Sequence, residues 1–353
     1  MNENADLRRK RRTRQGSNSV KLADVARLAG VSTGSVSRAL NEPHKVSAKL
    51  RSAVLKAVEE LDWVPHAGGR ALASLRSRTV GAIIPTLANP NFANEMNAVQ
   101  RRLIEAGYIL LIGCSEYDPD KALMQTRSMI ERGIDGLILV GENYSEGLWR
   151  LLAKQALPYV ITYGLRPGSP HPSVGVDNYQ AFVRLTNFVL DQGHRRVAMI
   201  AQRTENNDRA EARLRGTLDA LTARGIRIPE GQLVEKEWSV AEGRVALREI
   251  MSVLPPPTVV ICANDFLAVG AVLESQSLGI EVPRDLSVVG FDDVEIAAHL
   301  SPPLTTMRVP MYRLGELTAD HLIAKLRGAP VAHAVEVDAE LIVRGTVGPP
   351  RAP

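Results

Sequence analysis

Apolar positions between residues 22 and 61 recur at helical spacing and are interrupted twice. The first group ends at Gly30, whose permissive backbone suits a tight turn, and Ser32 can then cap a second helix. Ser47 can cap a third helix, and the three apolar stripes together predict a small three-helix core that contains a helix-turn-helix. The positions are Leu22, Val25, Ala26 and Ala29, then Val36, Ala39 and Leu40, then Leu50, Val54, Leu55, Val58 and Leu61.

From Thr79 onward, the pattern changes to strand-length apolar runs that alternate with amphipathic helices. This alternation predicts parallel sheets with crossover helices, hence an α/β fold. Asp177-Asn178 marks the start of a second unit of the same kind, and two similar halves imply a cleft between them. The runs are 80–85, 108–114, 136–140, 159–163, 197–201, 259–263 and 286–290.

A further helical stripe, at Phe92, Met96, Val99, Leu103 and Ile104, is too apolar for a fully exposed helix. It predicts either packing against the sheet, part of a subunit interface, or both.

Composition places the chain among globular proteins of more than one domain. It has 353 residues, of which 45% are hydrophobic and 23% charged. Its apolar runs are too short to span a membrane, and its charged amino terminus lacks the apolar stretch of a secretory signal, so we expect a cytoplasmic protein without membrane contact. The two cysteines, Cys114 and Cys262, suggest a reducing compartment.

Charge is distributed unevenly along the chain. Residues 1–78 contain 16 Lys and Arg against 7 Asp and Glu, whereas the remainder contains 27 against 32. A basic head on an acidic body is typical of a polyanion-binding module joined to a separate domain, because each neutralised phosphate releases a counterion. The run from Arg8 to Arg14 also fits a solvated, disordered arm.

The second helix of a helix-turn-helix enters the major groove of DNA, which makes its outer face the candidate reading surface. Thr33 and Arg38 are the candidate base contacts; Gly34 permits close approach, and Ser37 lies on the same side. Phosphate contacts are expected from Lys45, Ser47, Lys49 and Arg51. A plain helical hairpin is the alternative.

The pattern predicts a short helical segment after Pro65. Because Gly68-Gly69 lowers the stability of this helix, it needs a partner to be stable. Leu72 beside Arg70 suits insertion between base steps in the minor groove. The alternative is a flexible linker whose Leu72 rests on the core.

Polar residues at strand ends are the candidate effector contacts in the cleft, because ligands of parallel sheets bind there. Asn264 and Asp265 follow one strand and Asp292 another, Arg213 and Arg215 open a helix, and Asn91 with Phe92 should line the mouth from the other half. Asp265 also fits a helix cap. Asp292 and Arg215 also fit a salt bridge across an empty cleft.

The chain lacks the sequence signatures of most enzymes and metal sites. No two glycines are separated by a single residue, which excludes a G-x-G-x-x-G dinucleotide loop, and no G-K-[ST] or Cys-x-x-Cys occurs. We therefore expect no cofactor, no metal and no catalytic residue.

The run Leu22-Ala23-Asp24-Val25-Ala26, with Ala29-Gly30-Val31-Ser32, Val36-Ser37-Arg38, Val46-Ser47, Pro65 and Arg70-Ala71-Leu72, resembles the lactose/galactose repressor family of bacterial transcription regulators. The resemblance implies a two-lobed core like that of periplasmic binding proteins. It places Thr33, Gly34 and Arg38 at base-reading positions, Lys45 and Ser47 at phosphates, and Leu72 in a hinge helix. It matches Arg215, Asn264 and Asp292 to effector-holding residues and Trp238 to an aromatic on which the effector lies.

This resemblance also implies the organisation and partners of the chain. We expect a basic arm (1–20), a DNA-binding domain (21–65), a hinge (66–78) and two core lobes (79–176 with 308–335, and 177–307 with 336–353). The expected partners are double-stranded DNA with a palindromic operator, a second copy of the chain, and a small effector. A sugar or sugar acid is favoured over a nucleobase. The rivals are a solute-binding protein and an enzyme.

Overall fold

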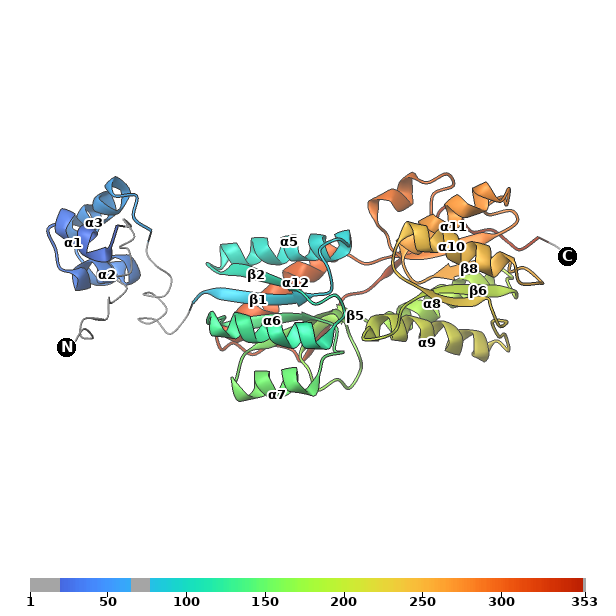
Figure 1. Cartoon of the computed structure of the whole chain (residues 1–353), viewed down its shortest axis with the longest axis horizontal. Helices are drawn as coiled ribbons and strands as arrows, with labels where there is room; N and C mark the ends of the chain where they lie inside the picture. Colours follow the sequence, from blue (N-terminus) through green and yellow to red (C-terminus); the bar gives the residue numbers. More distant parts are fainter. Residues whose placement is uncertain (1–19, 65–76, 352–353) are drawn as a thin grey trace, which may run out of the picture. The chain divides into compact units, whose positions relative to one another are not determined.

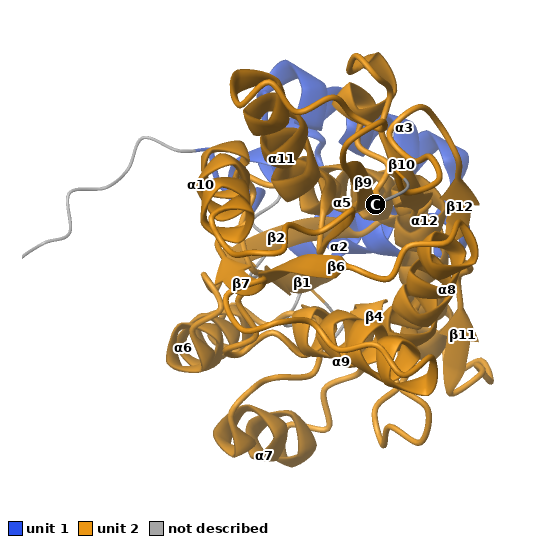
Figure 2. Ribbon diagram, turned by 90° about the vertical axis from the view of Figure 1, so that its right-hand side faces the viewer, with its two compact units in different colours: residues 1–75 blue, residues 76–353 orange. Residues whose placement is uncertain are grey.

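The computed structural model describes residues 20–64 and 77–351. The chain divides into two compact units, residues 1–75 and 76–353, which Figure 2 distinguishes by colour. The predicted contacts Arg70 and Leu72, and the predicted arm up to residue 19, lie outside the described residues.

The described part of the smaller unit, residues 20–64, contains three helices, as its apolar pattern predicts: α1 (Leu22–Leu28), α2 (Thr33–Asn41) and α3 (Ala48–Glu60), with a 3-10 turn at Pro43–Lys45. Gly30 adopts φ +67° in the turn between α1 and α2. Ser32 Oγ accepts a hydrogen bond from Ser35 N, and Ser47 Oγ from Leu50 N, so both serines cap helices as expected. The core consists of Val25, Ala26, Val36, Ala39, Val54, Ala57 and Trp63.

The larger unit begins with a lobe built on a parallel six-stranded sheet in the order β11-β5-β4-β3-β1-β2. Its strands are β1 (Thr79–Ile84), β2 (Ile109–Cys114), β3 (Gly136–Val140), β4 (Tyr159–Gly164), β5 (Ser173–Val176) and β11 (Ala334–Glu336). Helices α5 (Pro90–Glu105) and α12 (Met311–Leu326) cover one face, and α6 (Pro119–Glu131) and α7 (Glu146–Lys154) the other (Figure 1). Alternating residues of β1 pack accordingly, Val80 and Ala82 with α5 and Ile83 with α6.

The second lobe repeats this plan with the order β12-β10-β9-β8-β6-β7. Only the pairing of β10 with β12 is antiparallel among the described strands of this sheet. Its strands are β6 (Val197–Gln202), β7 (Leu233–Lys236), β8 (Val259–Cys262), β9 (Ser287–Asp292), β10 (Thr305–Arg308) and β12 (Glu340–Ile342). Its helices are α8 (Asn178–Asp191), α9 (Asp208–Ala223), α10 (Val240–Met251) and α11 (Asp265–Ser277), with a 3-10 turn at Glu295–His299.

The described chain passes between the two sheets three times: from β5 into α8, from β10 into α12, and from β11 into β12. The seven apolar runs all form strands, which confirms the predicted α/β fold. The stripe on α5 is mostly core, because Phe92, Met96, Val99 and Leu103 are buried; of the five residues, only Ile104 is exposed. The interface expected from that stripe is therefore reduced to one of its residues.

Helices α5 and α12 cross closely at Gly315. A Cβ atom there would overlap Glu95 O and lie 2.8 Å from Ala98 Cβ. We expect Gly315→Ala to lower the free energy of unfolding by about 1–3 kcal/mol, because overpacking outweighs the helix propensity that alanine adds. Urea unfolding would measure this. Gly147→Ala in α7 is the control, since its Cβ would meet the end of Leu123 at 3.2 Å and Ser145 Oγ at 3.6 Å, and no backbone atom within 4 Å; equal stability of the two variants would contradict the prediction.

Candidate functional site

The outer face of α2 carries the residues predicted to read DNA. Thr33, Gly34 and Arg38 are exposed, while Val36 and Ala39 face the core. Ser37 is half-buried and accepts a hydrogen bond from Asn41 Nδ2 at 3.2 Å. Gly34, Ser37 and Arg38 lie one, four and five positions after Thr33, so the four predicted positions form one continuous surface of the helix.

Lys45 and Ser47 lie just beyond α2. Lys45 Nζ is 2.9 Å from Glu42 Oε1, and both side chains are exposed, so this pair is weak and leaves the lysine available to a phosphate. Ser47 is exposed and sits at the amino terminus of α3, where unpaired backbone N–H groups favour an anion.

In the larger unit, Asp292 at the end of β9 is buried and accepts a hydrogen bond from Tyr163 Oη at 2.8 Å. Tyr163 belongs to β4, so this bond joins the two lobes. Burial raises the pKa of Asp292 to about 6, while Arg213 and the hydrogen bond from Tyr163 act to lower it. Asp292 adopts φ +115°, a backbone conformation that residues with a side chain rarely adopt.

Arg213 lies in the same cluster. Its side chain is buried, with Nε donating to Asn178 Oδ1 and Nη1 to Ala263 O, both at 2.8 Å. The guanidinium lies 4.0 Å from the centroid of the Phe291 ring. Backbone, amide and aromatic partners thus hold this cation in place beside Asp292.

The other predicted cleft residues differ in how they contact the residues around Asp292. Asn264 Oδ1 accepts from Leu267 N, which makes Asn264 the cap of α11, and its amide reaches Gln202 at 3.5 Å. Asn91 is buried, and its Nδ2 has no hydrogen-bond partner among the described residues. The Phe92 ring lies 5.4 Å from that of Tyr163. Trp238 is half-buried and meets the edge of Phe266.

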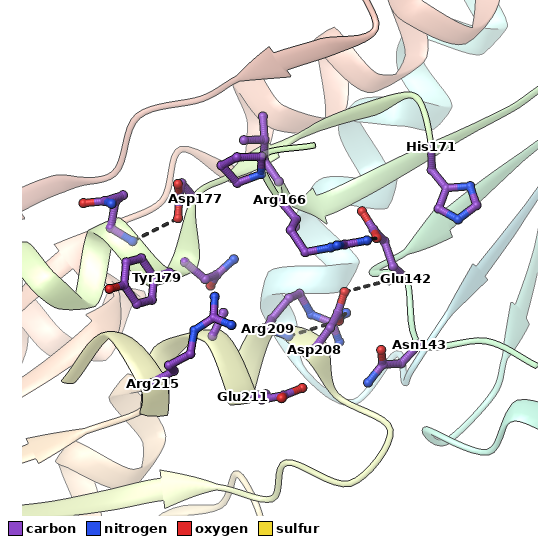
Figure 3. A pocket seen from close by; sticks show the side chains of 16 residues that line it. Glu142, Asn143, Arg166, His171, Asp177, Tyr179, Asp208, Arg209, Glu211 and Arg215 are labelled. Atoms are coloured by element: carbon purple, nitrogen blue, oxygen red, sulfur yellow. Dashed lines mark hydrogen bonds and ion pairs between the residues drawn. The ribbon is translucent and has the colours of Figure 1, made fainter. Parts of the chain in front are cut away.

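Arg215 is not brought to this cluster. It is exposed and lies over the ring of Tyr179 at 5.0 Å, within a separate pocket of about 700 Å³ between the lobes, shown in Figure 3. The other described lining residues include Glu142, Arg166, His171 and Arg209. A salt bridge of Arg215 with Asp292 is likewise not formed. Arg213 and Arg215 are two residues apart on a helix, about 200° around its axis, so only one can face Asp292.

Asp265 differs from its expected role as a cap. It is buried as the first residue of α11, where Oδ2 accepts from Val294 N and Oδ1 from Thr306 Oγ1. Burial and the nearby Asp292 raise the pKa of Asp265 to about 7. Asp293, which follows Asp292, instead pairs with Arg344 and Arg308.

Several residues of the cleft were not found by sequence reasoning. Tyr163 ends a strand that shows only as an apolar run, and Asn178 begins α8, where it holds Arg213. Asp208 and Arg209 begin α9 and contact the opposite lobe. The sequence offered one signal for Asp208 and Arg209: they lie just before Arg213, at the amino terminus of a helix that follows a strand.

Within residues 20–64 and 77–351, no helix is both long and apolar enough to cross a membrane. No three metal-ligating side chains in these ranges are grouped closely enough to hold an ion.

A helix-turn-helix unit joined to two parallel-sheet lobes with a polar cleft defines a ligand-responsive DNA-binding regulator. Residues 21–66 match the family model "Bacterial regulatory proteins, lacI family", and residues 186–347 match "Periplasmic binding protein-like domain". The transcriptional repressor CytR of Escherichia coli (strain K12) is 31% identical over 326 residues, covering 92% of this chain and 95% of CytR. The chain therefore belongs to the lacI family of sequence-specific transcription regulators.

Solved structures agree with this assignment. The Lac repressor dimer bound to operator and the anti-inducer ONPF is 26% identical, with a TM-score of 0.85, and the alignment covers 94% of this chain and 100% of that one. The complex of the regulator CelR with cellobiose is 28% identical, with a TM-score of 0.68 and coverage of 93% and 99%.

The raised pKa of Asp292 predicts a pH-dependent stability difference. Its usual pKa is about 3.9, so the folded chain takes up a proton between about pH 4 and 6 that the unfolded chain does not. As pH rises from 4 to 7, the wild type should lose on the order of 2 kcal/mol relative to Asp292→Asn, which retains an acceptor for Tyr163. Urea unfolding of both proteins at several pH values would measure this; a constant difference would contradict it.

Proposed function

We propose that this chain is a dimeric repressor that reads a palindromic operator through α2 and releases or tightens its hold when a sugar or sugar acid binds in the core. The observation that carries this proposal is the buried polar cluster at Asp292, which contains groups from both lobes. A regulator of this kind acts where operator DNA is, in the cytoplasm.

For DNA, the proposed base contacts are Thr33 and Arg38, with Gly34 and Ser37 forming the surface between them. Arg38 is exposed, carries no salt bridge among the described residues, and can bond bidentately to guanine. Lys45 and Ser47 are proposed to hold phosphates. Arg70 and Leu72 remain proposed contacts from sequence alone.

For the effector, the proposed site comprises Asn91, Phe92, Arg213, Trp238, Asn264 and Asp292. Carboxylate, amide and guanidinium groups at strand ends suit vicinal hydroxyls, and the aromatic rings suit a sugar face. The unpartnered Asn91 amide is a donor that such a hydroxyl can satisfy. The buried Arg213 favours an acidic sugar, and the relative CelR was solved with a sugar, cellobiose.

We further propose that the chain has no catalytic activity, because the buried carboxyls of Asp292 and Asp265 have structural partners: Asp292 has Tyr163, and Asp265 has Thr306 and Val294. A solute-binding protein without a regulatory role is disfavoured by the match of residues 21–66 to the lacI model.

The proposed homodimer has support in exposed apolar side chains on the first lobe. Ile104 at the end of α5 is 59% exposed, and Ile109 at the start of β2 is 64% exposed. Strand β2 is an edge of its sheet, so both its side chains and its backbone are available to a second copy.

Arg38→Ala should weaken binding to a selected operator by about 1–3 kcal/mol, roughly 5- to 150-fold, while binding to unrelated DNA falls much less. Arg27→Ala is the matched control, because it removes one exposed arginine from α1 in the same unit. Titrations at one fixed salt concentration would measure both. An equal loss for the two variants, or an equal loss on both DNAs, would remove Arg38 from the reading surface.

Thermal-shift screening with sugars, sugar acids and nucleobases should identify an effector, because a ligand bound only by the folded state adds about 2.7 kcal/mol at 100 times its Kd. Asp292→Asn should abolish most of that shift. Arg215→Ala should retain it, since Arg215 lies over Tyr179 outside the cluster. If Arg215→Ala lost the shift and Asp292→Asn kept it, the effector would belong in the separate pocket.

A further inference from the structure

The first residues of α9, in the second lobe, bind the turn that follows β3 in the first lobe. Asp208 Oδ2 accepts a hydrogen bond from Glu142 N at 2.7 Å, and Arg209 Nη1 donates to Val140 O at 3.2 Å. Arg209 also pairs with Asp208 Oδ1 at 2.8 Å. Figure 3 shows Asp208 and Arg209 lying against Glu142 in this arrangement.

The burial of Arg209 makes these contacts energetically significant. Its side chain is 6% exposed, and that of Asp208 is 24% exposed. The Tyr163 ring lies 6.0 Å from the guanidinium, and Asp208 with three nearby tyrosines raises the pKa of Arg209 despite its desolvation. A buried guanidinium is stable only when its donors are satisfied, so separating the lobes exchanges protein partners for water at this point.

The turn in the first lobe is shaped to receive this pair. Gly141 adopts φ +75°, and a Cβ atom on it would overlap Arg209 Nη1 and lie 2.5 Å from Asp208 Oδ1. The Gly141 N–H donates to Thr162 O, which ties the turn to β4. Glycine is therefore required here for the close approach of the other lobe, and not only for the conformation of the turn.

Contacts on either side of the pair depend on the same closed arrangement. Tyr163 Oη donates to Asp292 at 2.8 Å, and Gln202 Nε2 donates to Tyr117 Oη at 3.3 Å. Each of these bonds joins one lobe to the other. Opening of the lobes at the turn would also separate these partners, because both hydrogen bonds lie, like the turn, near the carboxyl ends of the strands.

We propose that Asp208 and Arg209 form an interlobe latch with Val140, Gly141 and Glu142, and that this latch is a positioning element of the effector site. It holds the lobes closed in the absence of effector, so that Asn91 and Tyr163 meet Arg213 and Asp292. The consequence for effector affinity rests on the proposed function, whereas the closure itself does not.

Pulsed EPR distances in the full-length chain, without effector, test the latch directly. Nitroxides on Lys154→Cys in α7 and Thr222→Cys in α9 report the spacing of the lobes, since both positions are exposed. Cys114→Ser and Cys262→Ala remove the native thiols, and excess unlabelled chain leaves one labelled protomer in each dimer. In wild type, most of the distance distribution should lie at the short spacing.

Gly141→Ala and Asp208→Ala should each shift at least half of that population to longer distances. Asp208→Asn should shift it less, because an amide oxygen can still accept from Glu142 N. Gly168→Ala is the matched control: Gly168 has the same φ of +75°, but its Cβ would meet nothing within 4 Å, so its strain is equal and its distances should equal those of wild type.

Superimposable distributions for wild type and Asp208→Ala would overturn the latch, as would a wild type already at the long spacing. If Gly141→Ala fails to fold, Asp208→Ala and Asp208→Asn decide the question. Effector titration of Asp208→Ala is the second arm: a loss of affinity of about tenfold or more, alongside a normal melting temperature, supports a positioning role. A normal affinity with open lobes would retain the latch and place the effector elsewhere.

Discussion

Closing the two lobes removes charged groups from water, and the fold depends on giving each of them a partner. Arg213 is held by Asn178, Ala263 O and the Phe291 ring, and Asp292 by Tyr163. A desolvated charge costs several kcal/mol unless its hydrogen bonds are replaced. The closed core itself supplies most of the hydrogen-bond partners that its buried polar groups need, but it leaves some groups unpaired, such as the Asn91 amide. The missing partners are what a polar ligand can supply, so binding and closure favour one another.

The smaller unit has a different limitation, because a three-helix core of this size buries little apolar surface. Val25, Val36, Val54 and Trp63 provide most of its interior, so local terms such as the Ser32 and Ser47 caps are a large part of its stability. The same small size leaves nearly all of the outer face of α2 exposed. Thr33 and Arg38 can therefore be exchanged with little effect on the core, which is what a surface that specifies a DNA sequence requires.

The sequence predicted the sheets well because strands buried on both faces are continuous apolar runs. Short edge strands such as β7 and β11 were not predicted, because three or four residues of mixed polarity show no recognisable hydrophobic periodicity. In the cleft, Asn264 and Asp292 lie at strand ends, as the apolar runs indicated, but the choice between Arg213 and Arg215 needs the rotation of α9 about its axis. Asp265 was expected to cap α11, whereas Asn264 does so. Tyr163, Asp208 and Arg209 act across the lobes, and no local pattern reveals a partner more than 60 residues away.

A ligand changes a conformational equilibrium only by its difference in affinity for the two states. Arg213, Asn264 and Asp292 all belong to the second lobe, so a molecule that bound them alone would bind open and closed cores equally and regulate nothing. Contact with Asn91 or Phe92 of the first lobe is what makes binding depend on closure. The Asp208–Arg209 latch acts on the same equilibrium before any ligand arrives. The stronger the latch, the larger the closed fraction and the higher the apparent affinity, but the smaller the change that an effector can still produce. Regulation therefore requires a latch of intermediate strength, and a single buried guanidinium beside a partly exposed aspartate is consistent with that requirement.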